Sequence, residues 1–168
     1  MSISVYDVTV PIFLRTLGNL AAILDKAAAH AQAKKIDPAV LLGLRLYPDM
    51  FALSRQIQLA SDFAKGAVAR LAGQEPPKYE DTETTIEQLQ ARIARTVDYV
   101  RSIDQRAFEG AETREISLKV RDTVQKHAGL AYLAHIALPN FFFHATTAYD
   151  ILRHNGVELG KRDFIGSA

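Results

Sequence analysis

The sequence predicts an all-α protein, a four-helix bundle that carries one small β-hairpin between its third and fourth long helices. Alanine, the strongest helix former, occurs 25 times in the 168 residues. Apolar residues recur three and four positions apart over four long stretches, which is the period of a helix with one buried face. One short stretch changes to a period of two, which is typical of a strand. We expect a single domain over residues 1–168, because a chain of this length can bury a sufficient core.

The first long helix is expected over residues 6–35. Its regular part begins near Pro11, because proline is tolerated only in the first turn. The helix ends before Asp37 and Pro38, which are typical of an N-cap followed by the first residue of a new helix. A short helix is therefore expected over residues 39–44.

The second long helix is expected over residues 49–71, opened by Pro48 and ended by Gly73, a residue type that favours the left-handed conformation after a helix. A proline-bearing connector follows over residues 74–81. The connections before and after this helix both exceed ten residues. Neighbouring helices are therefore free to be parallel, and a simple up-down-up-down order is not required.

The third long helix is expected to begin at Thr84, because its hydroxyl and the Glu87 carboxylate three residues later fit a capping box. Polar and apolar residues then alternate over residues 115–120, which predicts a strand. Residues 121–122 are the expected turn, and residues 123–126 return as the second strand of a hairpin.

The fourth long helix is expected over residues 130–155, with a kink at Pro139 and an end at Gly156. Residues 157–168 are polar and rich in glycine, so we expect them to form a tail without helix.

Composition excludes several classes of function. Twenty basic and nineteen acidic residues give a formal charge of +1, which supplies no strong field for nucleic acid or an anionic membrane. The absence of cysteine excludes disulfides and thiolate zinc ligands. The longest apolar stretch, residues 129–143, is too short to span a bilayer, and Asp7 interrupts the apolar region that a signal peptide requires. We therefore expect a cytoplasmic protein that binds neither nucleic acid nor a membrane.

A small polar cluster is expected where the second and fourth long helices meet. Asn140 and His144 are four residues apart and share one helix face, which Thr147 continues. On the second helix, Asp49 and Gln56 are seven residues apart and lie near one line. If these faces meet, the polar side chains form a satisfied buried network, a binding pocket or a metal site. The candidate pocket consists of Arg45, Asp49, Gln56, Asn140, His144 and Thr147.

Known metal-binding and catalytic motifs are absent from the sequence. It contains no H-x-x-x-H, H-E-x-x-H or E-x-x-H, which argues against zincin-type and di-iron bundle sites. It also contains no phosphate loop, nucleophile elbow or dinucleotide fingerprint, so no catalytic residue is assigned.

Three consecutive phenylalanines, residues 141–143, sweep about 200° of the fourth helix and cannot all face one core. Either this helix is covered on nearly every side, or one phenylalanine points into a partner or a ligand groove. Phe164 and Ile165 form an apolar pair beyond the last helix that must dock somewhere. We expect a homodimer in which one of these apolar surfaces is covered across a two-fold axis; docking of the tail on its own subunit is the alternative.

Three segments resemble a bacterial family of uncharacterised proteins. They are L-P-N-F-F-F-H…I-L-R-H-N-G-V-E-L-G-K-R-D-F-I-G at residues 138–166, P-D-M-F-A-L at residues 48–53 and E-D-T-E-T-T at residues 80–85. That family is similar to the DinB/YfiT-like four-helix bundles. The resemblance implies an up-down-down-up order and, in many members, a dimer. It also implies that, as in many members, a divalent metal is held by one histidine on the second helix and an H-x-x-x-H on the fourth, and that, as in several, small thiol-dependent substrates are transferred or isomerised.

Compared with the wider superfamily, His144 matches the second histidine of the H-x-x-x-H, and Asn140 occupies the position of the first. The ligand on the second helix would come from the region of Asp49. An amide is a weak ligand for zinc or nickel, so we expect a degenerate site with no tightly bound divalent ion and no cofactor. The expected function is a small-molecule-binding or assembly module. The alternative is a metal-dependent transferase or isomerase that acts on a small thiol-linked substrate.

Overall fold

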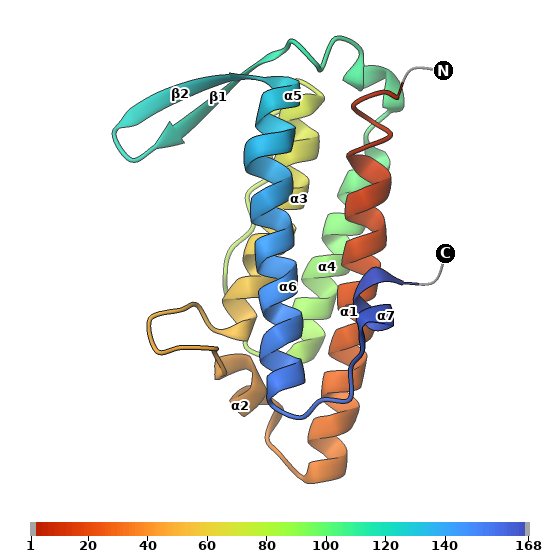
Figure 1. Cartoon of the computed structure of the whole chain (residues 1–168), viewed down its shortest axis with the longest axis vertical. Coiled ribbons are helices and arrows are strands. Elements are labelled where there is room, and N and C mark those ends of the chain that lie inside the picture. Colours follow the sequence, from red (N-terminus) through yellow and green to blue (C-terminus); the bar gives the residue numbers. More distant parts are fainter. Residues whose placement is uncertain (1–2, 167–168) are drawn as a thin grey trace.

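The computed structural model describes residues 3–166, which fold into a bundle of four long helices (Figure 1). These are α1 (Val10–Lys34), α3 (Leu53–Leu71), α4 (Ile86–Ser102) and α6 (Leu138–His154). In Figure 1, α1 and α6 run down the view, whereas α3 and α4 run up it. The expected up-down-down-up order is thus confirmed. Because α3 and α4 are parallel, the connector over residues 72–85 runs back along the length of the bundle.

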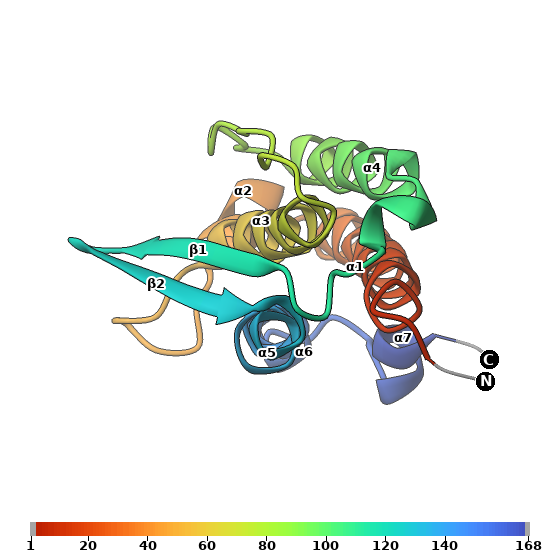
Figure 2. The same ribbon diagram turned by 90° about the horizontal axis from the view of Figure 1, so that it is seen from above.

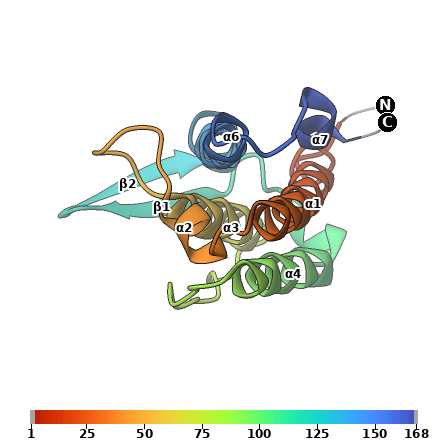
Figure 3. The same cartoon turned by 90° about the horizontal axis from the view of Figure 1, so that it is seen from below.

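The long helices enclose one core. Figures 2 and 3 show α4 and α6 on opposite sides of α3, and α1 packs against α4. Between α1 and α6, the fully buried rings of Phe13 and Phe141 meet edge to face with centroids 4.7 Å apart. Phe142 is partly buried and its ring meets that of Phe141 edge to face, whereas Phe143 remains 58% exposed. The three phenylalanines therefore divide between core and surface.

The expected hairpin is confirmed between the third and fourth long helices. Strands β1 (Glu115–Val120) and β2 (Thr123–Ala128) pair antiparallel, with Glu115 opposite Ala128 and Val120 opposite Thr123. The turn lies at residues 121–122, and Arg121 has a φ of 54°. The hairpin projects from one end of the bundle (Figures 1 and 2). It follows a short 3₁₀ helix, η1 (Gln105–Phe108).

The fourth long helix begins as α5 (Gly129–Tyr132) and continues through a π-helical turn, η2 (Leu133–Ala137), into α6. The expected kink at Pro139 takes the form of this π turn. The Leu138 N–H donates to the Leu133 carbonyl five residues earlier, and a wider turn accommodates the proline ring, which would clash in a regular helix. A side chain at Gly129 would place its Cβ 1.9 Å from the Ala111 carbonyl oxygen, so this close approach requires glycine.

The second long helix begins four residues later than predicted. Asp37 and Pro38 open the short helix α2 (Pro38–Gly43) as expected. The chain then forms a loop over residues 44–52, in which the Met50 N–H donates to the Tyr47 carbonyl at 3.0 Å. Pro48 thus occupies the second position of a turn, a place that suits proline as well as a first helical turn does. The prediction that Pro48 opens α3 was wrong.

Two smaller predictions also need correction. The capping box of α4 uses Thr85 and Gln88, one residue beyond the predicted pair. The C-terminal segment is not free of helix, because residues Lys161–Ile165 form α7, in which the Asp163 carboxylate accepts from the Gly160 N–H at 2.7 Å. The ring of Phe164 packs edge to face on Tyr149 of the same chain. The apolar pair at this end therefore docks at least in part on its own subunit.

Candidate functional site

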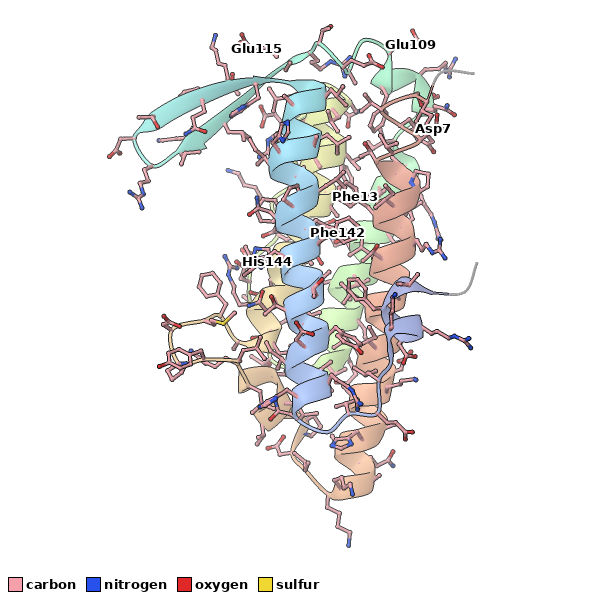
Figure 4. The ribbon with its side chains drawn as sticks, viewed as in Figure 1. Asp7, Phe13, Glu109, Glu115, Phe142 and His144 are labelled. Carbon is pink, nitrogen blue, oxygen red and sulfur yellow. The ribbon has the colours of Figure 1, made fainter. Side chains whose placement is uncertain are left out.

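His144 is the centre of the candidate site. It lies on the side of α6 that faces α3 (Figure 4) and is only 7% exposed. Its Nδ1 is 2.8 Å from Oε1 of Gln56, a buried residue on α3. The Gln56 amide nitrogen donates to the Phe51 carbonyl at 3.1 Å. A side chain on α6, a side chain on α3 and the loop before α3 are thus joined by one chain of hydrogen bonds.

This chain of hydrogen bonds fixes the tautomer of the imidazole. Because the Gln56 amide nitrogen donates to a carbonyl, Oε1 is the atom that faces His144, and it can only accept. Nδ1 therefore carries the proton when the ring is neutral, and Nε2 holds a lone pair. Burial, together with the charge of Arg55, lowers the pKa of His144 below its ordinary 6.5, so the ring is neutral at pH 7. Among the described residues, Nε2 has no hydrogen-bond partner.

Aromatic rings surround the imidazole. The Phe63 ring stacks on it, with centroids 5.6 Å apart and planes 18° from parallel. The Phe143 ring meets it edge to face at 5.3 Å. Phe143 is 58% exposed, so an apolar surface borders His144 on the solvent side. Phe51, whose carbonyl accepts from Gln56, is 57% exposed.

Arg55 supplies a positive charge to the same place. Its guanidinium carbon lies 5.9 Å from the centre of the Phe51 ring. Its Nη1 donates to the Gln58 side-chain oxygen at 3.2 Å and forms an ion pair with Asp81 of the connector. We define the His144 site as His144, Gln56, Phe51, Arg55, Phe63 and Phe143.

A buried ion network fastens the connector next to this site. Arg92 of α4 is 4% exposed and forms ion pairs with Asp62 at 2.8 Å, Asp81 at 3.0 Å and Glu83 at 2.9 Å. Burial alone would raise the pKa of Glu83, but hydrogen bonds from Arg92 and Gln58 lower it overall. Because Asp81 also pairs with Arg55, the network reaches the His144 site.

A tyrosine reinforces the same attachment of the connector. The Tyr79 ring lies within 4.0 Å of the Arg95 guanidinium carbon and 4.7 Å of the Lys65 ammonium group, both measured to the ring centre. Cation–π contacts of this kind stabilise by about 0.5–2 kcal/mol each. Residues 79–83 are therefore held against α3 and α4.

Of the six predicted pocket residues, the structure brings together two, His144 and Gln56. Asn140 and Thr147 are on the expected face of α6, but each donates to a backbone carbonyl four residues earlier, at 2.7 Å. Arg45 and Asp49 are exposed on the loop over residues 44–52. This loop explains the difference: with α3 starting at Leu53, the expected helical line through Asp49 and Gln56 does not exist.

Sequence reasoning did not find Phe51, Arg55, Phe63 or Phe143 as partners of the histidine. Phe63 was detectable, because it is seven residues after Gln56 and therefore lies two turns along the same line of α3. Arg55 and Phe51 gave no such signal, since their positions depend on the start of α3 and on the path of the connector.

The donors at this site do not fit the divalent metal that the resemblance implies. His144 offers one nitrogen, while the Gln56 amide is bonded at both ends and the Asn140 amide nitrogen donates to the helix backbone. Within residues 3–166, no three histidine, aspartate or glutamate side chains come close enough to hold a metal ion. Tight sites for zinc-like ions need three protein ligands.

One imidazole lies between the second and fourth long helices of an up-down-down-up bundle. This geometry places the chain among the DinB-like bundles. The crystal structure of a DinB family member protein from Shewanella denitrificans is similar over 97% of this chain and 92% of that one, with 47% sequence identity and a TM-score of 0.92. Residues 5–165 match the family described as domain of unknown function (DUF1993), and the chain belongs to that family. The comparison with curated proteins finds no match. In the described part of the chain, no helix combines the length and hydropathy needed to cross a membrane.

Proposed function

We propose that the protein is a binding module that holds a small, flat molecule at the His144 site. The observation that carries this proposal is the neutral imidazole in contact with the rings of Phe63 and Phe143, whose Nε2 lone pair has no partner in the described structure. An imidazole held in this way accepts a hydrogen bond from an O–H or N–H group of a ligand. The exposed rings contribute apolar contact on either side.

The shape of the surface sets the kind of ligand. Two hollows, of 820 Å³ and 490 Å³, lie elsewhere, beside α7 and beside η1, and His144 lines neither of them. A ligand at His144 is therefore held chiefly by ring contacts and one directed hydrogen bond, which favours a planar ring with a single donor. The surroundings are preorganised, because Gln56 and Phe63 fix the imidazole before any ligand arrives.

Titration with phenol tests the proposal. Phenol has one ring and one O–H donor, so we expect it to shift the Nε2 nitrogen resonance of His144 and to raise the melting temperature. His144→Gln is expected to abolish both effects, whereas His154→Gln, at an exposed position of the same helix, leaves them unchanged. If phenol does not perturb His144 in the wild-type protein at millimolar concentration, the site does not bind ligands of this kind.

We further propose that the protein assembles as a homodimer in the bacterial cytoplasm. Large apolar side chains are exposed on the loop before α3 and on α6, with Tyr47 at 66%, Phe51 at 57% and Phe143 at 58%. A second copy that packs on Tyr47 and on the outer edges of the Phe51 and Phe143 rings would remove them from water and would enclose the His144 site without occupying it. Sedimentation at micromolar concentration is expected to give a dimer, and Phe143→Ser is expected to shift it toward monomer. A species of 18.6 kDa for the wild type contradicts the dimer.

A further inference from the structure

We propose that Arg55 makes the His144 site selective for carboxylates, so that its ligand is a small aromatic or apolar carboxylic acid with a hydrogen-bond donor. This inference rests on the proposed binding function and adds the charge of the ligand to it. The structure places a guanidinium, an imidazole acceptor and exposed aromatic rings along the first turns of α3 and the facing side of α6.

The guanidinium of Arg55 has donors to spare. One nitrogen, Nη1, makes both of its hydrogen bonds, to Gln58 and to Asp81. Among the described residues, Nε and Nη2 have no partner. A guanidinium carries five N–H donors in a planar fork, and two parallel donors match the two oxygens of a carboxylate. The side chain of Arg55 is 35% exposed, so part of it is open to a ligand.

Arg55 and His144 are linked through Phe51 and Gln56. Arg55 directly precedes Gln56, which bonds to the imidazole. The guanidinium of Arg55 lies over the Phe51 ring, and the backbone carbonyl of Phe51 accepts the hydrogen bond from Gln56. The charge of Arg55 reaches His144, since it contributes to the lowered pKa of the imidazole. A ligand that lies against the Phe51 ring can therefore direct its carboxylate to Arg55 and its donor to Nε2 of His144.

Asp81 opposes anion binding at this position. Its carboxylate pairs with Nη1 of Arg55 and with Arg92 at 3.0 Å, and its negative charge repels a carboxylate that approaches the Nε–Nη2 edge of Arg55. Its side chain is 37% exposed at the edge of the connector. Removing the charge of Asp81 is therefore expected to strengthen anion binding, whereas removing Arg55 is expected to weaken it.

The test compares 4-hydroxybenzoate, phenol and inorganic phosphate by nuclear magnetic resonance titration of the full chain. We expect 4-hydroxybenzoate to bind wild type at least tenfold more tightly than phenol, and Arg55→Gln to remove that advantage while phenol binding persists. Asp81→Asn is expected to tighten 4-hydroxybenzoate binding several-fold. Arg106→Gln, which removes an exposed arginine paired with Asp104, serves as the matched control and is expected to change nothing.

Three results would overturn the inference, and they differ from failure of the proposed function. Equal affinities for phenol and 4-hydroxybenzoate in wild type and in Arg55→Gln leave the binding site intact but remove its selectivity for carboxylates. Tighter binding of phosphate than of 4-hydroxybenzoate assigns Arg55 to a different anion. Weaker 4-hydroxybenzoate binding in Asp81→Asn contradicts the repulsion between Asp81 and the ligand, and it does so even if Arg55→Gln fails to fold. If phenol also fails to bind wild type, the proposed function itself is wrong.

Discussion

Replacing Gln56 by leucine tests the mechanism that prepares His144. Gln56 is 1% exposed and makes two hydrogen bonds, one to the imidazole and one to the Phe51 carbonyl. The leucine variant leaves both partners unpaired, at about 1–3 kcal/mol each, while burial of the leucine side chain returns about 1.5–3 kcal/mol. We expect a net loss of about 2 kcal/mol in the free energy of unfolding, or roughly 4–8 °C in melting temperature for a chain of this size.

Urea unfolding measures that loss, and phenol titration measures its consequence. Without Gln56, the neutral imidazole is no longer restricted to the Nδ1–H tautomer, so phenol is expected to bind the variant more weakly. Gln125→Leu, at an exposed position of β2, is the matched control and is expected to stay within about 0.5 kcal/mol of wild type. A Gln56→Leu variant that matches the control in both stability and phenol affinity would show that Gln56 neither stabilises the fold nor sets the tautomer of His144.

Three further predictions concern the ion network of Arg92, the pH dependence of stability and the binding of metal at His144. Arg92→Met is expected to lower the free energy of unfolding by about 2 kcal/mol and to speed proteolysis within residues 74–85. The loss is smaller than for a fully buried ion pair because the carboxylate partners of Arg92 are partly exposed. Arg101→Met, at an exposed position of α4, should have neither effect. The free energy of unfolding is expected to fall as pH drops through 6.5, because His144 is protonated more readily in the unfolded state than in the folded state. It is expected to fall again below about 4.5, where Glu83 is protonated more readily in the unfolded state. Urea unfolding of His144→Gln should show only the second decline. Dialysis against a chelator is expected to leave less than stoichiometric divalent metal by elemental analysis; a stoichiometric ion that persists and is lost in His144→Ala would support the metal-dependent alternative.

Much of the fold was predictable because its signals are local. The periodicity of apolar residues located the four long helices, and alternation over residues 115–120 located the hairpin. Gly73 and Gly156 end α3 and α6 with φ values of 73° and 89°, a conformation that glycine adopts without strain. Each of these features depends on a few neighbouring residues, so one sequence was enough to find it.

The candidate site was only partly predictable because it depends on where helices begin and how they meet. Pro48 is compatible with both a helix start and a turn. In the structure it lies in a turn, so Asp49 is on an exposed loop and not on α3. His144 and Gln56 were both identified as candidates, but their direct contact joins residues 88 positions apart. The position of Arg55 depends on Asp81 of the connector, which has no periodic pattern of its own.

The protonation of His144 is the most direct test of the account. A long-range ¹H–¹⁵N spectrum of wild-type protein, recorded from pH 8 to pH 5, reports the state of both ring nitrogens. We expect a protonated Nδ1 and an unprotonated Nε2 at pH 7, with a pKa of His144 below 6.5. A ring protonated at Nε2, or a pKa above 6.5, would contradict the hydrogen-bond chain from which the proposed binding site is built.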